Sequence, residues 1–158
     1  MPFFQKLQDS EFTNWFLGSD SIWTYPTVLT LHTIGMAMLV GASMVVHLRV
    51  LRVAPGFPLD RLRGLYKIAW VGFLINLVSG LVLFITEAAD RVVDPVFYIK
   101  LGSIGLALWF GVLVKRRLID REPASVRKAR GARLLSMTSL GLWTVAIVAG
   151  RLMAYLKK

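Results

Sequence analysis

Apolar residues fall into four long blocks, which are separated by short polar or basic stretches. The blocks cover about residues 26–53, 59–88, 95–118 and 125–156. As an α-helix rising about 1.5 Å per residue, each block is long enough to cross a bilayer core about 30 Å thick. They bring the hydrophobic content to 56%, above the roughly 45–50% typical of soluble domains. The pattern predicts an all-α fold, with a four-transmembrane-helix bundle over residues 22–158.

Residues 1–21 have a different pattern, because no continuous apolar block occurs there. Aromatic residues such as Phe3, Phe12 and Trp15 instead alternate with polar and acidic ones. This mixture is typical of short amphipathic helices that lie in the membrane interface. We therefore expect an interfacial amphipathic segment before the first span, with a partly ordered tail as the alternative.

Charged residues are distributed unevenly between the two sides of the predicted bundle. Acidic residues gather near the N-terminus and between the second and third blocks, whereas basic residues gather in the other two connections. Since short loops rich in Lys and Arg stay in the cytoplasm, we expect a multi-pass protein of the bacterial cytoplasmic (inner) membrane with both termini periplasmic. The net charge of +10 is then explained by the lipid bilayer as partner, without nucleic acid. The basic connections contain Arg49, Arg52, Arg61, Arg63 and Lys67, and Lys115, Arg116, Arg117, Arg121, Arg127, Lys128, Arg130 and Arg133.

The two histidines of the chain, His32 and His47, both lie in the first apolar block. Fifteen helical residues place them about 22 Å apart along the axis and about 60° apart around it, so they share a face. Gly35 and Ser43 lie between them on this face and leave space for a flat cofactor or for a neighbouring helix. The arrangement resembles the haem-bearing helices of cytochrome b, in which histidines about four turns apart hold one haem near each membrane face.

The resemblance implies two haem b groups, each with two axial histidines, whereas one chain supplies two histidines in all. A homodimer with the first helix at its twofold axis would supply four, and closed twofold dimers are the commonest oligomers. Methionine ligation by Met137 and Met153 within one chain is a less suitable alternative, because these residues lie about 160° apart around their helix. Any haem would be held non-covalently, since the chain contains no cysteine. The alternative for both histidines is a hydrogen-bonding role between helices.

Other polar residues lie near the ends of the predicted spans. Glu87, Lys100 and Arg151 lie near the outer face and could bind haem propionates or a quinone, or could close the bundle through an ion pair. Arg49 near the inner face could bind the propionates of an inner haem, or it could act only as one of the basic residues that determine the orientation of the protein in the membrane. Asn76 in the second block is typical of an interhelical hydrogen bond.

Several short motifs together resemble an uncharacterised bacterial family of four-helix integral membrane proteins. They are TLHTIGMAMLVG, LRVL, WVGF, SGLVLF, FYIKL and AGRLMAYL, within about residues 22–156. The resemblance implies that His32, Glu87, Lys100 and Arg151 are the family's polar positions. The family commonly has Asp before LRVL, where this chain has His47, so a second haem would be special to this chain or its subgroup. The chain also resembles, more loosely, the copper-resistance D-type membrane proteins.

Three functions follow as hypotheses. The first is a b-type dihaem cytochrome that moves electrons across the membrane as a homodimer, with quinone or a redox protein as partner. The second is a non-catalytic accessory or assembly subunit of a larger membrane complex. The third is a transporter for a small solute or for copper, for which Met36, Met38, Met44 and His32 would be ligands.

Overall fold

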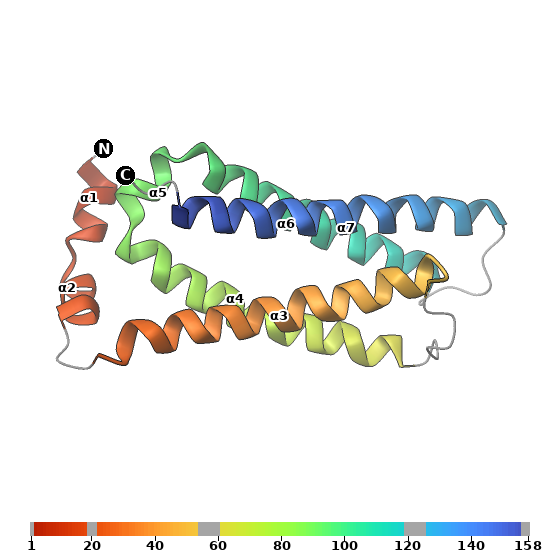
Figure 1. The fold of residues 1–158 in the computed structure, drawn as a ribbon, viewed down its shortest axis with the longest axis horizontal. Coiled ribbons are helices and arrows are strands. Elements are labelled where there is room, and N and C mark those ends of the chain that lie inside the picture. The colour runs from red at the N-terminus through yellow and green to blue at the C-terminus, as the bar shows by residue number, and fades with distance from the viewer. Residues whose placement is uncertain (1, 19–21, 54–60, 119–125, 156–158) are drawn as a thin grey trace. The chain divides into compact units, whose positions relative to one another are not determined.

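The computed structural model describes residues 2–18, 22–53, 61–118 and 126–155. Every regular element within these ranges is a helix, and there are seven (Figure 1). Four of the seven are long and apolar enough to cross a membrane, in agreement with the predicted all-α fold. The helices are α1 (Pro2–Gln8), α2 (Glu11–Gly18), α3 (Thr24–Val50), α4 (Leu62–Thr86), α5 (Ala88–Val93), α6 (Pro95–Leu118) and α7 (Val126–Tyr155).

The segment between the second and third apolar blocks differs from its prediction. The blocks that end at residue 88 and begin at residue 95 leave a short connection, for which Asp90 and Pro95 predict a turn, whereas the structure has the short helix α5 over Ala88–Val93. Glu87 occupies the N-cap position and forms an ion pair with Arg91 one turn later. Such an i,i+4 pair supports a single helical turn, so a segment rich in turn residues is nevertheless helical.

The end of α3 also differs from its prediction, because the helix stops at Val50 rather than Val53. Arg52 has a φ of 65°, in the left-handed region. The Val53 amide donates to the Leu48 carbonyl at 3.0 Å, and the Arg52 amide donates to the Arg49 carbonyl at 3.1 Å. These two bonds form a Schellman cap, which usually has glycine at the left-handed position.

The chain divides into two compact units. Unit 1 consists of residues 1–39 and 70–95, and unit 2 consists of residues 40–69 and 96–158. The two long helices α3 and α4 therefore each contribute one part to unit 1 and another part to unit 2.

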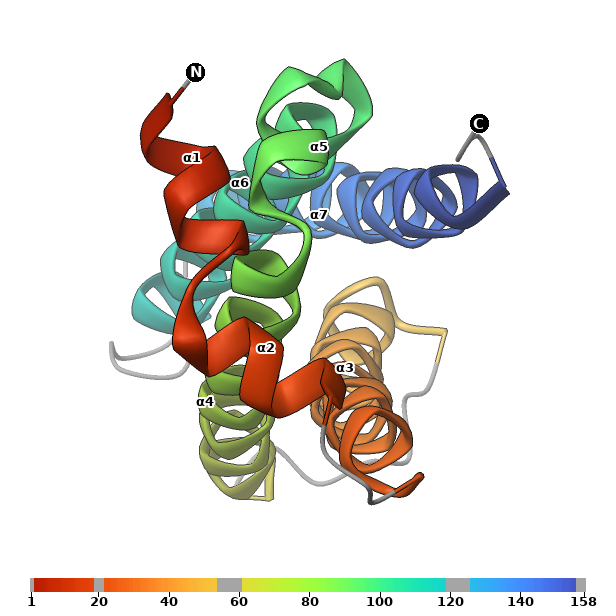
Figure 2. The ribbon, with the colours of Figure 1, turned by 90° about the vertical axis from the view of Figure 1, so that its left-hand side faces the viewer.

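In unit 1 the two N-terminal helices contact other helices of the unit: α1 contacts α5, and α2 contacts the beginning of α3. Helix α1 contacts α5, and the Gln8 side chain accepts a hydrogen bond of 2.9 Å from the Ala89 amide at the start of α5 (Figure 2). Phe16 of α2 is buried and meets the Tyr25 ring edge-on, with 6.5 Å between the ring centroids. These contacts attach α2 to the beginning of α3.

Helices α3 and α4 run antiparallel in unit 1 and approach closely at two glycines. A Cβ atom added at Gly35 would lie 2.7 Å from the Asn76 amide nitrogen and 2.9 Å from the Gly72 carbonyl oxygen. A Cβ added at Gly72 would lie 2.7 Å from the Leu39 amide nitrogen. Small residues at such crossings let backbones meet, which is the usual basis of packing between membrane helices.

In unit 2 the antiparallel helices α6 and α7 share a buried face. Ala107 and Val114 of α6 and Ala132 and Trp143 of α7 are buried. The Ser139 hydroxyl donates to the Ala107 carbonyl across the two helices at 3.1 Å.

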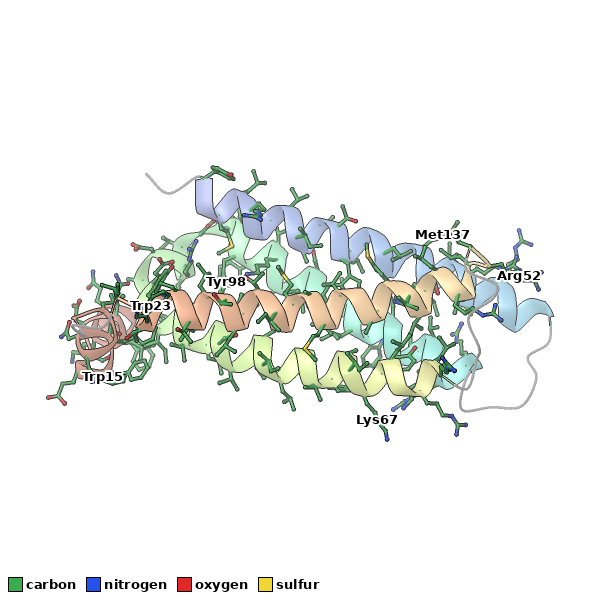
Figure 3. All side chains as sticks on the ribbon, turned by 60° about the horizontal axis from the view of Figure 1, so that its bottom comes forward. Trp15, Trp23, Arg52, Lys67, Tyr98 and Met137 are labelled. Carbon is green, nitrogen blue, oxygen red and sulfur yellow. The ribbon has the colours of Figure 1, made fainter. Side chains whose placement is uncertain are left out.

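At one end of unit 2 a tyrosine joins α4 to α6. The Tyr66 hydroxyl donates to the Gly111 carbonyl at 3.2 Å, and the Lys115 amine lies 5.6 Å from the centre of the Tyr66 ring. Figure 3 shows Arg52 and Lys67 toward this end of the unit and Tyr98 toward the other end. Basic residues are thus concentrated at one end of unit 2.

Candidate functional site

His32 lies on the face of α3 that meets α4 in unit 1. Its Nδ1 atom is 3.1 Å from the Asn76 carbonyl oxygen and 3.1 Å from the Ser79 hydroxyl. In return, the Asn76 side-chain amide donates to the His32 carbonyl at 2.9 Å. The three contacts connect one turn of α3 to one turn of α4.

These contacts determine which imidazole nitrogen carries the proton. A backbone carbonyl can only accept a hydrogen bond, so Nδ1 of His32 must donate to Asn76. The Ser79 hydroxyl donates to the Ile75 carbonyl at 2.6 Å, so its oxygen can accept from the same Nδ1 hydrogen. In the neutral ring, Nε2 then carries the lone pair. Nε2 is therefore the atom of His32 that can bind a metal.

Gly80 makes room for the His32 ring. A Cβ atom at position 80 would lie 3.1 Å from Cε1 and 3.4 Å from Nδ1 of the imidazole. The first distance is too short for an ordinary contact, so a side chain there would displace the ring. Gly80 thus positions the imidazole against α4.

The space beside Gly35 is occupied by helix α4 and not left open for a cofactor. From the sequence, Gly35 could leave space either for a macrocycle or for a neighbouring helix. In unit 1 the backbone of α4 fills the space beside Gly35, with Gly72 and Asn76 in contact. Between α3 and α4 a flat cofactor therefore has no room at Gly35, and the glycine serves helix packing there.

His47 lies on α3 in unit 2 and is 1% exposed. Its Nδ1 atom is buried and has no hydrogen-bond partner among the described residues. Leaving a buried polar atom unsatisfied costs about 1–3 kcal/mol, which a bound metal or an ordered water would offset. Ser43 and Arg49, which belong to the same predicted site, lie nearby in the sequence on α3 and are half-buried.

The polar residues Glu87, Lys100 and Arg151 are distributed over both units. In unit 1 Glu87 accepts two hydrogen bonds from Arg91, at 2.9 and 2.5 Å. In unit 2 the Lys100 side chain lies along α7, with its Cε atom 3.7 Å from the Cβ position of Gly150. Arg151, the next residue on α7, is exposed. The structure thus places Lys100 beside the turn of α7 that carries Arg151, and gives Glu87 a local partner in Arg91.

Sequence reasoning did not assign Gly72 or Arg91 to any role, and it gave Ser79 only a role in helix packing and interhelical hydrogen bonds. Ser79 lies three residues after Asn76 on one helical face, and this spacing could have identified both as neighbours of one side chain. No signal in the sequence indicated that Gly72 would meet Gly35, because two residues on different helices have no fixed register before packing.

No family model, no curated protein and no solved structure matches this chain. The resemblance to a family of four-helix membrane proteins therefore rests on the sequence motifs alone. Among the described residues, no group of three or more His, Asp or Glu side chains could hold a metal ion. The chemistry available in these residues is that of single imidazoles on an apolar helix.

Proposed function

We propose that this chain is a multi-pass protein of the bacterial inner membrane that carries haem b and moves electrons across the bilayer. Membrane insertion is supported by the surfaces of the long helices. We considered the most apolar stretch of 18 residues in each long helix. The share of these residues that is buried inside the protein is only 22% in α3, 17% in α4, 11% in α6 and 33% in α7. Soluble proteins rarely expose apolar surface on this scale, whereas hydrocarbon chains cover it without cost.

The observation that carries the haem proposal is the hydrogen bond from Nδ1 of His32 to the Asn76 carbonyl. Metal-binding histidines commonly donate their second ring nitrogen to a carbonyl, which orients the ring and makes the free nitrogen a better ligand. Ser79 and Gly80 reinforce this orientation from the same helix. His32 would thus be an axial ligand through Nε2.

His47 would be the second ligand position along α3. Its Nδ1 atom, which has no hydrogen-bond partner among the residues that the structure describes, fits a residue that gains a partner when a cofactor binds. Two such ligands per chain would require a homodimer to complete two bis-histidine haems. Bound haem would supply one-electron exchange with a quinone or a redox protein. Arg49, Lys100 and Arg151 would bind propionates or a quinone through charge-assisted hydrogen bonds.

The test is the haem content of the purified protein and of three variants, measured by absorption and pyridine haemochrome. We expect about one haem per chain in the wild type and about half a haem per chain in each single variant, His32→Ala or His47→Ala. The haem content of Thr33→Ala should equal that of the wild type. Thr33 is a matched control, since it is exposed on α3 and its hydroxyl donates to the Leu29 carbonyl of its own helix. A Soret band that persists unchanged in both histidine variants would contradict the assignment.

The second candidate is a non-catalytic accessory subunit, which the contacts between α3 and α4 favour. The His32, Asn76 and Ser79 hydrogen bonds and the glycine crossing would join these helices without any cofactor. This function predicts a colourless protein that co-purifies with a larger complex. In that case His32→Ala would impair assembly of the complex without changing any absorption band.

A further inference from the structure

Two buried polar side chains of α7 are not used by the proposed haem site. Among the described residues, three buried side-chain atoms have no hydrogen-bond partner: Nδ1 of His47, Oγ of Ser136 and Nε1 of Trp143. All three residues belong to unit 2. His47 is a ligand of the proposed haem, whereas Ser136 and Trp143 lie on α7 and need partners of another kind.

The indole of Trp143 can only donate a hydrogen bond, so it needs an acceptor. The side chain is 2% exposed, whereas the other four tryptophans of the chain are at least half exposed. Trp143 is thirteen residues from Arg130 and ten from Met153, the ends of its candidate span, and thus about 20 Å and about 15 Å from them. In a membrane-embedded chain, phospholipid headgroups cannot reach this nitrogen, and an unpaired donor there is costly.

Ser136 lies on the same face of α7 as Trp143. Seven residues separate them, which places them about 20° apart around the helix and about 10.5 Å apart along it. The threonines of α7 donate to the carbonyl four residues earlier in their own helix, and Ser139 donates to the Ala107 carbonyl of α6. The fully buried Ser136 hydroxyl has neither kind of bond among the described residues.

The burial of these two groups determines the size of the ligand that they can hold. Side chains exposed by 2% or less leave no opening for a lipid, a quinone or a solute, whereas a single water molecule can be enclosed. Buried waters in proteins typically bond to polar groups that have no other partner. A water that bridges two groups spans about 6 Å, so Ser136 and Trp143, about 10.5 Å apart, need separate waters.

We propose that α7 binds at least two internal water molecules, one that accepts a hydrogen bond from the Trp143 indole and one that bonds the Ser136 hydroxyl. Each water would donate its own hydrogens to backbone carbonyls, since buried waters normally make two to four hydrogen bonds. The waters would place exchangeable protons inside an apolar span, on the face of α7 that packs on α6. These sites do not require haem, so a colourless protein would still contain them.

The first experiment is water-selective NMR of the full chain in detergent micelles, with isotopic labels at the indole nitrogens of tryptophan. We expect a rotating-frame cross-peak between water and the Trp143 indole hydrogen, with the sign that distinguishes a bound water from proton exchange. Trp109 is the matched control, because it also lies within a candidate span but is 64% exposed, and it should have no such cross-peak. The Trp143 signal is the one that remains after each exposed tryptophan has been replaced in turn by Phe.

The second experiment compares Ser136→Ala with Ser139→Ala during unfolding by increasing mole fractions of SDS. Both substitutions gain the same helix propensity, and Ser139→Ala loses the bond to the Ala107 carbonyl. A water on the Ser136 hydroxyl predicts that Ser136→Ala also unfolds at a lower mole fraction of SDS than the wild type. A hydroxyl without a partner predicts an unchanged or higher midpoint, because alanine removes a buried polar group that makes no bond.

Each water has its own contradicting result. A missing water cross-peak at Trp143 would overturn the first site, as would an equal cross-peak at Trp109, which would show that water enters the micelle without selection. An unchanged or higher SDS midpoint in Ser136→Ala would overturn the second site. Circular dichroism confirms that the variants are folded, and the test of Trp143 needs no substitution at that residue.

Discussion

The glycine crossing between α3 and α4 makes the sharpest prediction about stability. Replacing Gly35 with Ala would place a methyl group 2.7 Å from the Asn76 amide nitrogen and 2.9 Å from the Gly72 carbonyl oxygen. Both atoms belong to a helical backbone and cannot rotate away. Since ordinary contacts begin at 3.4 Å, the two helices must separate locally by about 0.7 Å. Overpacking of this kind costs about 1–3 kcal/mol.

The same substitution at Gly41 is the control. Gly41 lies on the same helix and has no atom within 4 Å of its Cβ position. Both variants gain the helix propensity of alanine, up to about 1 kcal/mol, so this gain cancels when they are compared. Gly35→Ala should therefore be about 1–3 kcal/mol less stable than Gly41→Ala.

The assay is unfolding of the detergent-solubilised protein by increasing mole fractions of SDS, followed by tryptophan fluorescence and circular dichroism. The pair Gly72→Ala and Gly64→Ala repeats the comparison on α4, because Gly64 also has open space at its Cβ position. If Gly35→Ala and Gly41→Ala unfold within about 0.5 kcal/mol of each other, the close crossing is refuted.

Three further substitutions follow from single contacts. Arg52→Gly should stabilise the protein by about 1 kcal/mol in the same SDS titration, because glycine adopts the left-handed φ of 65° without strain; a loss of stability would contradict the cap. Ser139→Ala should cost about 0.6 kcal/mol, the average for hydrogen bonds between membrane helices, whereas exposed Thr144→Ala, which loses a bond within its own helix, should cost less. Asn76→Leu should lower the stability by about 1–3 kcal/mol, because it removes the amide that donates to the His32 carbonyl and because leucine is bulkier at the interface between the helices. Unchanged stability would show that the contact between the helices is absent.

The helices themselves follow from the sequence because their signal is local. Four apolar blocks of the right length need no tertiary information, and they correspond to α3, α4, α6 and α7. Their ends are less predictable, since they depend on how individual residues cap them. Arg52 adopts a conformation that usually indicates glycine, and Glu87 pairs with Arg91 to start a helix where turn residues predicted a loop.

The candidate site is only partly predictable, since it depends on contacts between helices. The sequence places His32 and His47 on one helix, but it does not show that His32 contacts Asn76 and Ser79. Nor does it show that Nδ1 of His47 lacks a hydrogen-bond partner within the part of the chain that the structure describes. Gly35 illustrates the same limit. A small residue near a histidine can leave space for a cofactor or for a neighbouring helix. At Gly35 the choice between these two follows only from the position of Gly72, whose backbone on α4 lies against the glycine.

Whether α3 binds haem, as we propose, is decided by the reduced-minus-oxidised absorption spectrum of the purified protein. The protein should be expressed with a haem supply and purified in a mild detergent. A Soret band with sharp reduced α and β bands, at about one haem per chain, is the predicted result. A colourless protein that is folded by circular dichroism would contradict the claim, and the contacts between α3 and α4 would then be those of an assembly subunit.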